Sequence, residues 1–495
     1  MPKHNNAIDA KHPNILYIMS DQHSARVMGC AGDSAADTPN LDSLAKSGTR
    51  FSRAYCPSPV CLPSRMSMLT GLRPHQQECW TNDDILDSGK PTWLHGLGAA
   101  GYRPVLFGRM HALGPDQLHG YTDRPIGDHS PNWPGVARRS LGALAKTSGP
   151  FKQSIEKSGV GQSSYQLLDA DVLDASINFL KDHAKSGDGE PFCLSASFML
   201  PHPPYVASKR DFDAVKDHVQ PPAQPLPNNQ EHPWIKLWRE SKSLDNISAE
   251  AIHRARCAYY ALVRQLDRAI GQLLTTLDEI GERENTLIIY VSDHGDHLGE
   301  RGLFWKHTFY EESVKVPLIM SWPAKIEQNR TCKHPIETGG LGNTILTLVG
   351  CPPLPSASMP SFDNLLTGKS TPKDQPVFIE YCIDDLPQWT EGYAVQQRAV
   401  ILGQLKYIFC NGFPDQLFDL KHDPAELNNI AQDPLAQEML AKLRDLVFAD
   451  WNPDQIAERI EARKADKQLL KAWAEKTNPA EKCRWDLKAE QNYLD

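Results

Sequence analysis

Two largely apolar runs, residues 14–20 (NILYIMS) and 285–292 (NTLIIYVS), are each followed directly by an aspartate. Runs without polar alternation are typical of strands that are buried on both faces, as in a parallel sheet. Two further runs, 191–199 and 316–323, also read as strands. Between and around them lie amphipathic stretches that predict helices, at 39–48, 169–185 and 248–281. The pattern predicts an α/β domain with a mostly parallel sheet sandwiched by helices.

The C-terminal quarter has a different pattern. Residues 351–375 are rich in Pro and Ser and predict a loop or linker. The short runs 398–403 and 405–410 and a helix near 435–449 predict a small α+β subdomain, and residues 454–475 predict a charged helix. We therefore expect three parts: a catalytic α/β domain (1–375), a C-terminal α+β subdomain (376–450) and a helical tail (451–495).

Two aromatic residues of the polar tail, Trp485 and Tyr493, need a surface to pack on. They can pack on their own subunit or on a second copy of the chain, and the sequence favours neither. An inter-subunit role for the tail would fit a homo-oligomer, which we expect for this protein.

Charge and cysteine content exclude several classes of protein. The net charge is −9 (52 Lys and Arg against 61 Asp and Glu), without a basic block, which argues against a nucleic-acid-binding surface. No apolar stretch approaches the roughly 18 residues of a membrane span. The eleven cysteines include no CxxC pair, so neither a disulfide framework nor a structural zinc site is indicated. The polar first residues lack the apolar core of a signal peptide. We expect a cytoplasmic protein, or a periplasmic one if the N-terminus is truncated.

Cys61 opens the stretch Cys61-Leu62-Pro63-Ser64-Arg65. Pro63 suits the first turn of a helix, and Arg65 would follow within that turn. A cysteine at a helix N-terminus beside a guanidinium is in an activating environment. The alternative is a buried, inert cysteine, which is the commoner case for a lone cysteine.

Both aspartates that end the apolar runs are followed by a second possible ligand. Asp21 precedes Gln22, and Asp293 precedes His294. Ligands in α/β sheets sit at the carboxyl ends of the strands, so the two pairs could form one metal site with three oxygen ligands and one nitrogen. Oxygen ligands suit Ca²⁺ or Mg²⁺, while an imidazole favours Mn²⁺ or another transition ion. A strand-end aspartate can also be no more than a helix cap.

The CxPSR stretch followed by MSMLTG resembles the signature of the type I sulfatases, a family of the alkaline phosphatase superfamily. In that family this cysteine is converted to formylglycine after translation. The Asp-Gln and Asp-His pairs look like those of its choline-sulfatase and phosphonate-monoester-hydrolase branch. The resemblance implies an alkaline-phosphatase-like fold, one divalent metal ion (Ca²⁺ or Mn²⁺), and a formylglycine-generating maturation enzyme that acts on Cys61.

Four more residues match elements of that family. Arg109 and His111 stand where the family has Lys-x-His, with arginine in place of lysine. His202 (LPHPPY) matches its His-Pro element, and Lys306 (GLFWKH) matches its lysine after the metal pair. The resemblance implies that Arg65, Arg109 and Lys306 neutralise the anionic ester. His202 would protonate the leaving alcohol, helped by Lys306, and His111 would act as the base.

These residues predict a sulfuric ester hydrolase that binds a small anionic ester, a small organic or sugar sulfate, and releases inorganic sulfate by a formylglycine gem-diol nucleophile. A phosphonate monoester or phosphodiester hydrolase with the same site is the alternative. A catalytically inactive binding protein is a third reading. For the alcohol half we expect Asn82 and Trp133 to bind substrate, with Trp80, Asp83 and Trp485 as further candidates. The rings of the three tryptophans could form a cage for a choline headgroup. A sugar sulfate is equally compatible with these residues.

Overall fold

A computed structural model describes residues 12–187, 189–223, 231–368, 373–383 and 394–495. The polar N-terminal residues 1–11, and residues 369–372 of the expected linker, lie outside the described residues. The remainder of that linker is mostly loop. It also contains the short helix α12 (Asp363–Leu366) and packs Met359 and Phe362 into the interior.

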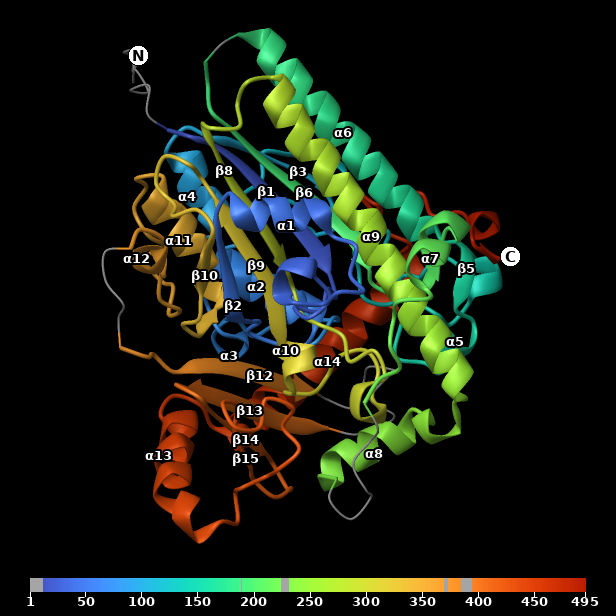
Figure 1. Cartoon of the computed structure of the whole chain (residues 1–495), viewed down its shortest axis with the longest axis vertical. Coiled ribbons are helices and arrows are strands. Elements are labelled where there is room, and N and C mark those ends of the chain that lie inside the picture. The colour runs from blue at the N-terminus through green and yellow to red at the C-terminus, as the bar shows by residue number, and fades with distance from the viewer. Residues whose placement is uncertain (1–11, 188, 224–230, 369–372, 384–393) are drawn as a thin grey trace.

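A nine-stranded sheet forms the centre of the main domain (Figure 1). The order across it is β10-β2-β9-β8-β1-β6-β3-β4, with β11 also paired to β2. The strands are β1 (Asn14–Asp21), β2 (Thr49–Tyr55), β3 (Arg103–Gly108), β4 (Asp123–Ile126), β6 (Phe192–Pro201), β8 (Thr286–Ser292), β9 (Lys315–Ser321), β10 (Arg330–Cys332) and β11 (Ile336–Glu337).

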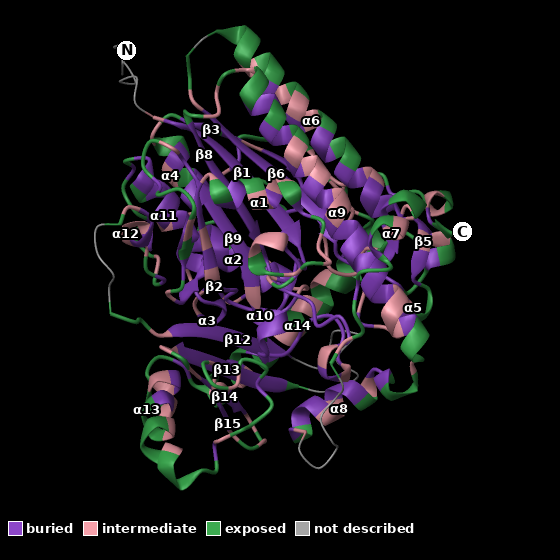
Figure 2. Ribbon diagram, viewed as in Figure 1, coloured by how far each residue is buried: buried purple, intermediate pink, exposed green. Residues whose placement is uncertain are grey.

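The sheet is mostly parallel, as the apolar runs predict. Strands β8, β1, β6, β3 and β4 run parallel to one another, and β9 runs antiparallel to both of its neighbours, β8 and β2. Every residue of β1, β6 and β8 is buried. Figure 2 shows the sheet as a continuous buried layer. Burial on both faces explains why these strands are apolar throughout.

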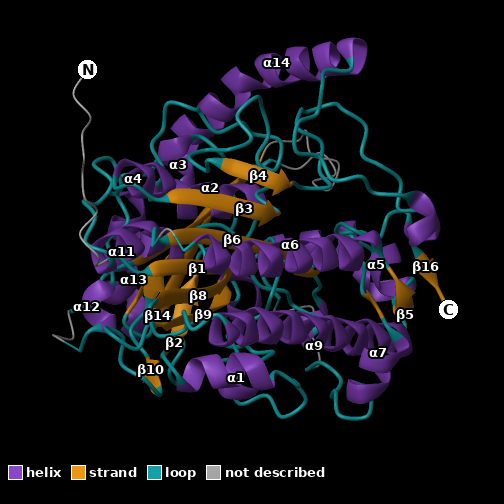
Figure 3. Ribbon diagram, turned by 90° about the horizontal axis from the view of Figure 1, so that it is seen from above, coloured by secondary structure: helices purple, strands orange, loops and turns teal. Residues whose placement is uncertain are grey.

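Helices cover both faces of the sheet (Figures 1 and 3). One face carries α1 (Pro39–Lys46), α6 (Ser164–Ser186) and α9 (Ala249–Glu279). The other carries α2 (Cys61–Thr70), α4 (Trp93–Ala99) and α11 (Leu341–Leu348). The predicted sandwich is therefore confirmed. No helix among the described residues is long and apolar enough to cross a membrane. The shorter helices are α3 (Pro74–Gln77), α5 (Gln153–Glu156), α7 (Lys209–Val215), α8 (Pro233–Ser241) and α10 (Glu311–Val314).

The second, antiparallel sheet has the strand order β12-β13-β14-β15, and it packs below the main domain (Figure 1). Its strands are β12 (Val377–Ile383), β13 (Val395–Leu402), β14 (Leu405–Cys410) and β15 (Gln416–Asp419), followed by α13 (Gln437–Phe448) and α14 (Pro453–Thr477). The α+β subdomain and helical tail are thus present. The expected boundaries at 375 and 450 stay a prediction, since residues of β12 belong to the same apolar core as the main sheet.

A buried lysine connects the two sheets. Lys406 of β14 is fully buried, and its Nζ lies 2.7 Å from Glu311 of the main domain and 2.7 Å from Glu426. It also donates to the Phe309 carbonyl oxygen at 2.9 Å. Burial acts to lower the pKa of Lys406, but the two carboxylates outweigh it and raise that pKa. Lys406 is the cation that these two buried carboxylates share; Glu311 also pairs with Lys315 at 3.0 Å, and Glu426 lies 3.9 Å from Arg301.

The tail ends on its own subunit. Strand β16 (Tyr493–Leu494) pairs with β5 (Gly159–Gln162), which also pairs with β7 (Val206–Ala207). The Trp485 indole donates to Asp171 of α6 at 2.7 Å, and the Trp485 ring packs against the main core. Trp485 thus packs on its own subunit, as one of the two alternatives expected. Tyr493, in contrast, is 44% exposed.

We predict that Lys406→Met destabilises the protein by about 3–5 kcal/mol, because it leaves Glu311 and Glu426 buried without their common cation. Unfolding in denaturant would measure the change. The exposed Lys421 provides the control, and Lys421→Met should change stability by less than about 0.5 kcal/mol. A loss below 1 kcal/mol for Lys406→Met would show that Lys315 and Arg301 suffice to compensate the two carboxylates.

Candidate active site

Two carboxylates meet at one edge of the main sheet because β1 and β8 are parallel neighbours. Their register pairs Ser20 with Ser292, so Asp21 and Asp293, the next residue in each strand, lie side by side. Both side chains are fully buried. Arg65 holds them together: its Nε donates to Asp293 Oδ2 at 2.8 Å, and one terminal nitrogen donates to Asp21 Oδ2 at 3.0 Å. The predicted convergence of the two strand ends is present.

Cys61, the first residue of α2, lies next to these carboxylates. Arg65 follows one helical turn later and therefore faces the same side. The Cys61 Sγ lies 3.1 Å from Lys306 Nζ, 3.1 Å from His294 Nε2 and 3.9 Å from Asp21 Oδ1. Burial and Asp21 act to raise the pKa of the Cys61 thiol, but Lys306 and a hydrogen bond with His202 outweigh them, and the pKa is lowered. This is a reactive position, unlike that of an inert core cysteine.

The strand-end side chains form a group that could hold a metal ion. Ligand atoms of Asp21, Asp293, His294 and Cys61 all lie within 4.8 Å of one another. His294 Nδ1 contacts the Gly295 carbonyl oxygen at 3.1 Å, and a carbonyl can only accept, so Nδ1 carries the proton. The lone pair on Nε2 then faces the carboxylates. Burial lowers the pKa of His294 to about 4, which keeps the ring neutral as a ligand must be. These donors fit a divalent ion.

Gln22, the fourth expected ligand, is held from both ends of its amide. Its Oε1 accepts from Lys306 Nζ at 2.7 Å, and its Nε2 donates to Asp296 Oδ2 at 2.6 Å. Asp296 also accepts from the Tyr205 hydroxyl at 2.6 Å. The Gln22 oxygen is thereby fixed toward the Cys61 side. Sequence reasoning missed Asp296, although its place in SDHGD, two residues after His294, is a usable signal.

Arg109 and His111 follow β3 and occupy the other side of Cys61. Arg109 Nε donates to Asp21 Oδ2 at 2.5 Å, and one terminal nitrogen pairs with Asp128 at 3.1 Å. The other donates to His111 Nδ1 at 2.8 Å. Burial, then Arg109, lower the pKa of His111 well below its usual value. A guanidinium only donates, so the neutral His111 ring carries its proton on Nε2. Asp128, which also accepts from the His111 backbone, was missed because it lies in a loop without a motif.

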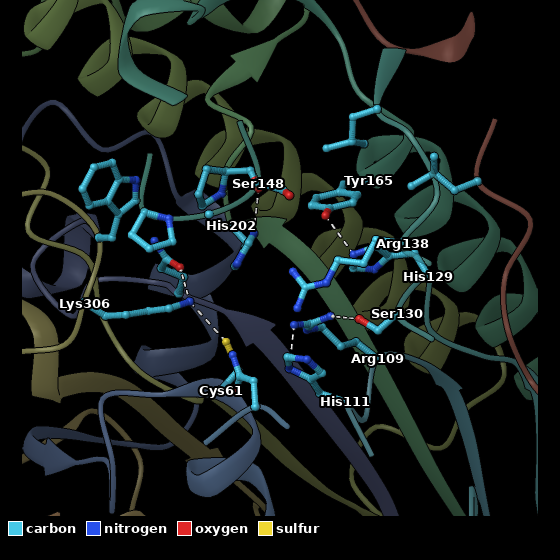
Figure 4. A pocket seen from close by; sticks show the side chains of 18 of the residues that line it. Cys61, Arg109, His111, His129, Ser130, Arg138, Ser148, Tyr165, His202 and Lys306 are labelled. Carbon is cyan, nitrogen blue, oxygen red and sulfur yellow. Dashed lines mark hydrogen bonds between the residues drawn. The ribbon is translucent and has the colours of Figure 1, made fainter. Parts of the chain in front are cut away.

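His202 approaches from the loop after β6. Its Nδ1 lies 2.7 Å from the Pro203 carbonyl oxygen, which fixes the proton there and turns Nε2 toward Cys61. Burial lowers the pKa of His202 although Asp21 opposes the shift. Figure 4 shows His202 and Lys306 on one side of Cys61, and Arg109 and His111 on the other.

Part of this group borders a single pocket of about 850 Å³, a volume that includes its open mouth. Of the expected catalytic residues, Cys61, Arg109, His111, His202 and Lys306 line it, and Arg65 lies beneath. Gln22 and Asn82 also line the pocket, and Asn82 Oδ1 accepts from the Leu62 amide at the start of α2. Sequence reasoning missed the outer wall, which includes His129, Arg138, Ser148, Tyr165 and Leu487.

The expected tryptophans are not in this lining. Trp133 packs edge-on against Trp473 of α14, with ring centroids 5.0 Å apart. Trp80 is buried in the core of the C-terminal subdomain beneath Arg459 and Arg463. Trp485 packs on α6. The position of a tryptophan in the sequence does not indicate which cavity its ring will line.

Strand-end carboxylates beside a helix-starting cysteine, bordered by cationic side chains, form a site suited to hydrolysis of an anionic ester. Comparison with known proteins gives the family. Residues 13–351 match the Sulfatase family, and residues 299–450 match the family described as N-sulphoglucosamine sulphohydrolase, C-terminal. The chain belongs to the sulfatase family, and its homologues are hydrolases of sulfuric ester bonds.

Two relatives illustrate the match. Choline-sulfatase of Rhizobium meliloti (strain 1021) is 33% identical over 460 residues, covering 89% of this chain and 87% of that protein. Arylsulfatase K of Canis lupus familiaris is 29% identical over 450 residues, covering 85% and 79%. Among solved structures, the phosphonate monoester hydrolase of Agrobacterium radiobacter superimposes with a TM-score of 0.69 at 19% identity, covering 92% of this chain and 96% of that one. At that identity the likeness shows the fold.

Proposed function

We propose that this sulfatase releases inorganic sulfate from a small organic or sugar sulfate, with residue 61 as formylglycine. The observation that carries the proposal is the position of Cys61. Its sulfur lies at the start of a helix, within 3.1 Å of both Lys306 Nζ and His294 Nε2, and it faces the open pocket. A nucleophile here would have cationic groups on one side and metal-ligand atoms on the other.

Asp21, Gln22, Asp293 and His294 would hold the divalent ion, for which Ca²⁺ and Mn²⁺ are our candidates. When bound, the ion supplies Lewis-acid activation of the nucleophile and of the ester. Formylglycine at position 61 supplies a hydrated aldehyde, one hydroxyl of which is the nucleophile. The other hydroxyl provides an intramolecular route to release sulfate that a serine or cysteine ester lacks.

Cationic side chains would stabilise the negative charge on the sulfate oxygens. Arg109 and Lys306 reach the pocket from opposite sides, and each is held by a buried acceptor before substrate arrives. Preorganised groups of this kind contribute several kcal/mol each in a buried site. Arg65 keeps the two strand-end carboxylates in place and contributes charge from below.

His202 would protonate the departing alcohol. Its Nδ1 proton is fixed by the Pro203 carbonyl, so a second proton must enter on Nε2, which faces the reacting centre. An anionic ester favours that protonation by charge attraction. His111 has the reverse arrangement: with Nδ1 accepting from Arg109, its Nε2 proton is available to a sulfate oxygen. We therefore propose a hydrogen-bond donor role for His111. The base role expected from sequence would require the Arg109 contact to break.

A phosphonate monoester or phosphodiester hydrolase is the second candidate, because the Gln22 and His294 variants resemble those of a branch that contains choline-sulfatases and phosphonate monoester hydrolases alike. The complete set of Cys61, cations and ligand atoms argues against an inactive binding protein. The maturation enzyme, the homo-oligomer and the cytoplasmic location stay predictions.

The first test concerns residue 61 and the substrate class together. Protein produced with a maturating enzyme should contain the aldehyde or its hydrate at position 61, measured by peptide mass spectrometry. On matched sulfate, phosphate and phosphonate esters, kcat/KM should be highest for sulfate, and Cys61→Ala should abolish turnover. Full activity with unmodified Cys61 would contradict the mechanism. A preference for phosphonates would support the second candidate.

The second prediction concerns the metal. Asp293→Ala and Asp293→Asn should lose the bound ion and turnover, measured by elemental analysis and kinetics on the purified variants. The exposed Asp278 serves as the control, and Asp278→Ala should retain both. Thermal unfolding would verify that each variant is folded. An Asp293 variant that keeps one equivalent of metal would remove this residue from the ligand set.

The third prediction concerns the acid. His202→Ala should slow hydrolysis of alkyl sulfates by about 10²–10⁴ more than that of activated aryl sulfates, because a phenolate leaves without protonation. His218→Ala, on the exposed surface, should affect neither class. Equal losses on both classes would instead assign His202 a positioning role and make Lys306 the better candidate for the acid.

A further inference from the structure

The pocket extends well beyond the space that a sulfate group needs. Its lining reaches from Cys61 to His129, Arg138 and Leu487, which lie outside the group of side chains around Cys61. The sulfate must lie at the Cys61 end, among the catalytic side chains. The alcohol half of the substrate therefore faces the outer wall, which consists of loop residues 129–131, 138, 139, 141 and 148–150 with Leu487 from the tail.

The charged side chains around the pocket are all cationic. Among the described residues that line the pocket, none is an aspartate or a glutamate, while Arg109, Arg138, Arg139 and Lys306 all line it. Arg139 is compensated by Asp486 of the tail, at 2.6 Å. Arg138 differs, because no carboxylate of the described chain forms an ion pair with it. Figure 4 shows Arg138 pointing from the rim toward the centre of the pocket, on the side of Arg109 and His111.

The backbone that carries Arg138 is anchored on both sides by the tail. Arg484 donates to the carbonyl oxygen of Ala137 at 3.1 Å, and Arg139 donates to the carbonyl oxygen of Trp485 at 2.9 Å. Arg484 also donates to the His129 carbonyl oxygen at 3.2 Å. Anchoring lowers the entropy lost when a side chain on such a loop binds a ligand. An exposed arginine is thus held over the mouth of the pocket.

We infer that the preferred substrate carries a second anion on its alcohol half, a carboxylate or a second sulfate, and that Arg138 binds it. This inference rests on the proposed sulfatase function. A guanidinium binds carboxylate and sulfate oxygens through paired hydrogen bonds, so both anions share one recognition chemistry. Arg138 is then a specificity-determining residue, separate from the groups that act on the ester sulfur.

The same wall disfavours a cationic alcohol such as choline. A quaternary ammonium would face Arg138 with no carboxylate in the lining to offset the repulsion. The tryptophans considered for an aromatic cage lie elsewhere, and among the described lining residues Trp305 and Tyr165 are the only tryptophan and tyrosine that such a group could contact.

The experiment compares wild-type holoenzyme with Arg138→Gln on three sugar sulfates: a neutral hexose 6-sulfate, a sulfated uronic acid and a hexose disulfate. Wild-type kcat/KM should be higher for the two dianionic esters. Arg138→Gln should lose about 10- to 100-fold on those esters and much less on the neutral sugar, with the loss mainly in KM. Arg138→Lys should recover part of the loss. Arg103→Gln, a matched change at an exposed position on β3, should leave all three rates unaltered.

The two dianionic arms distinguish the source of the second anion, since a carboxylate-specific site would favour the uronic acid and a sulfate-specific site the disulfate. Equal losses on all three substrates, or faster hydrolysis of choline sulfate than of either dianion, would overturn the inference while leaving the sulfatase function intact. No hydrolysis of any sulfate ester by matured, metal-loaded protein would overturn the proposed function, and the inference with it.

Discussion

The active site depends on one arginine that holds two carboxylates at the same sheet edge. Parallel neighbouring strands bring Asp21 and Asp293 together, and without a cation the two buried charges would repel each other. The Arg65 guanidinium satisfies one oxygen of each, at 3.0 Å and 2.8 Å. Because Arg65 lies one turn after Cys61, the same contact fixes the position and rotation of α2. The register of β1 and β8 thus places the carboxylates, and one planar guanidinium joins them to the helix that carries the nucleophile.

Most of the catalytic geometry was predictable because it is carried by strand ends and a short motif. An apolar run predicts where a buried strand ends, and parallel neighbours bring those ends to one edge. Asp21 and Asp293 could thus be paired across the chain from sequence alone. Cys61 and Arg65 needed only the periodicity of one helical turn. The local signals for these residues and their tertiary positions agree, as expected for a site built on regular elements.

The residues that sequence reasoning missed lie in loops. Asp128 holds Arg109 and the His111 backbone, but it belongs to an irregular segment whose path is determined by contacts with residues far away in sequence, such as Arg484. Trp133 was expected in the pocket, and it packs against Trp473 because α14 covers that side of the loop. The conformation of a loop depends on what it packs against, and neither hydrophobic periodicity nor a motif records that information.

Catalysis and selectivity are carried by different parts of the chain. The groups around Cys61 belong to the sheet edge and α2, whereas the outer wall is a surface loop tied down by the last residues of the chain. Arg139 and Asp486, which join them, are 347 residues apart. In evolutionary terms the loop and the tail form an exchangeable unit: paired changes in both could redirect the enzyme to another alcohol, while the costly buried charges beneath stay untouched.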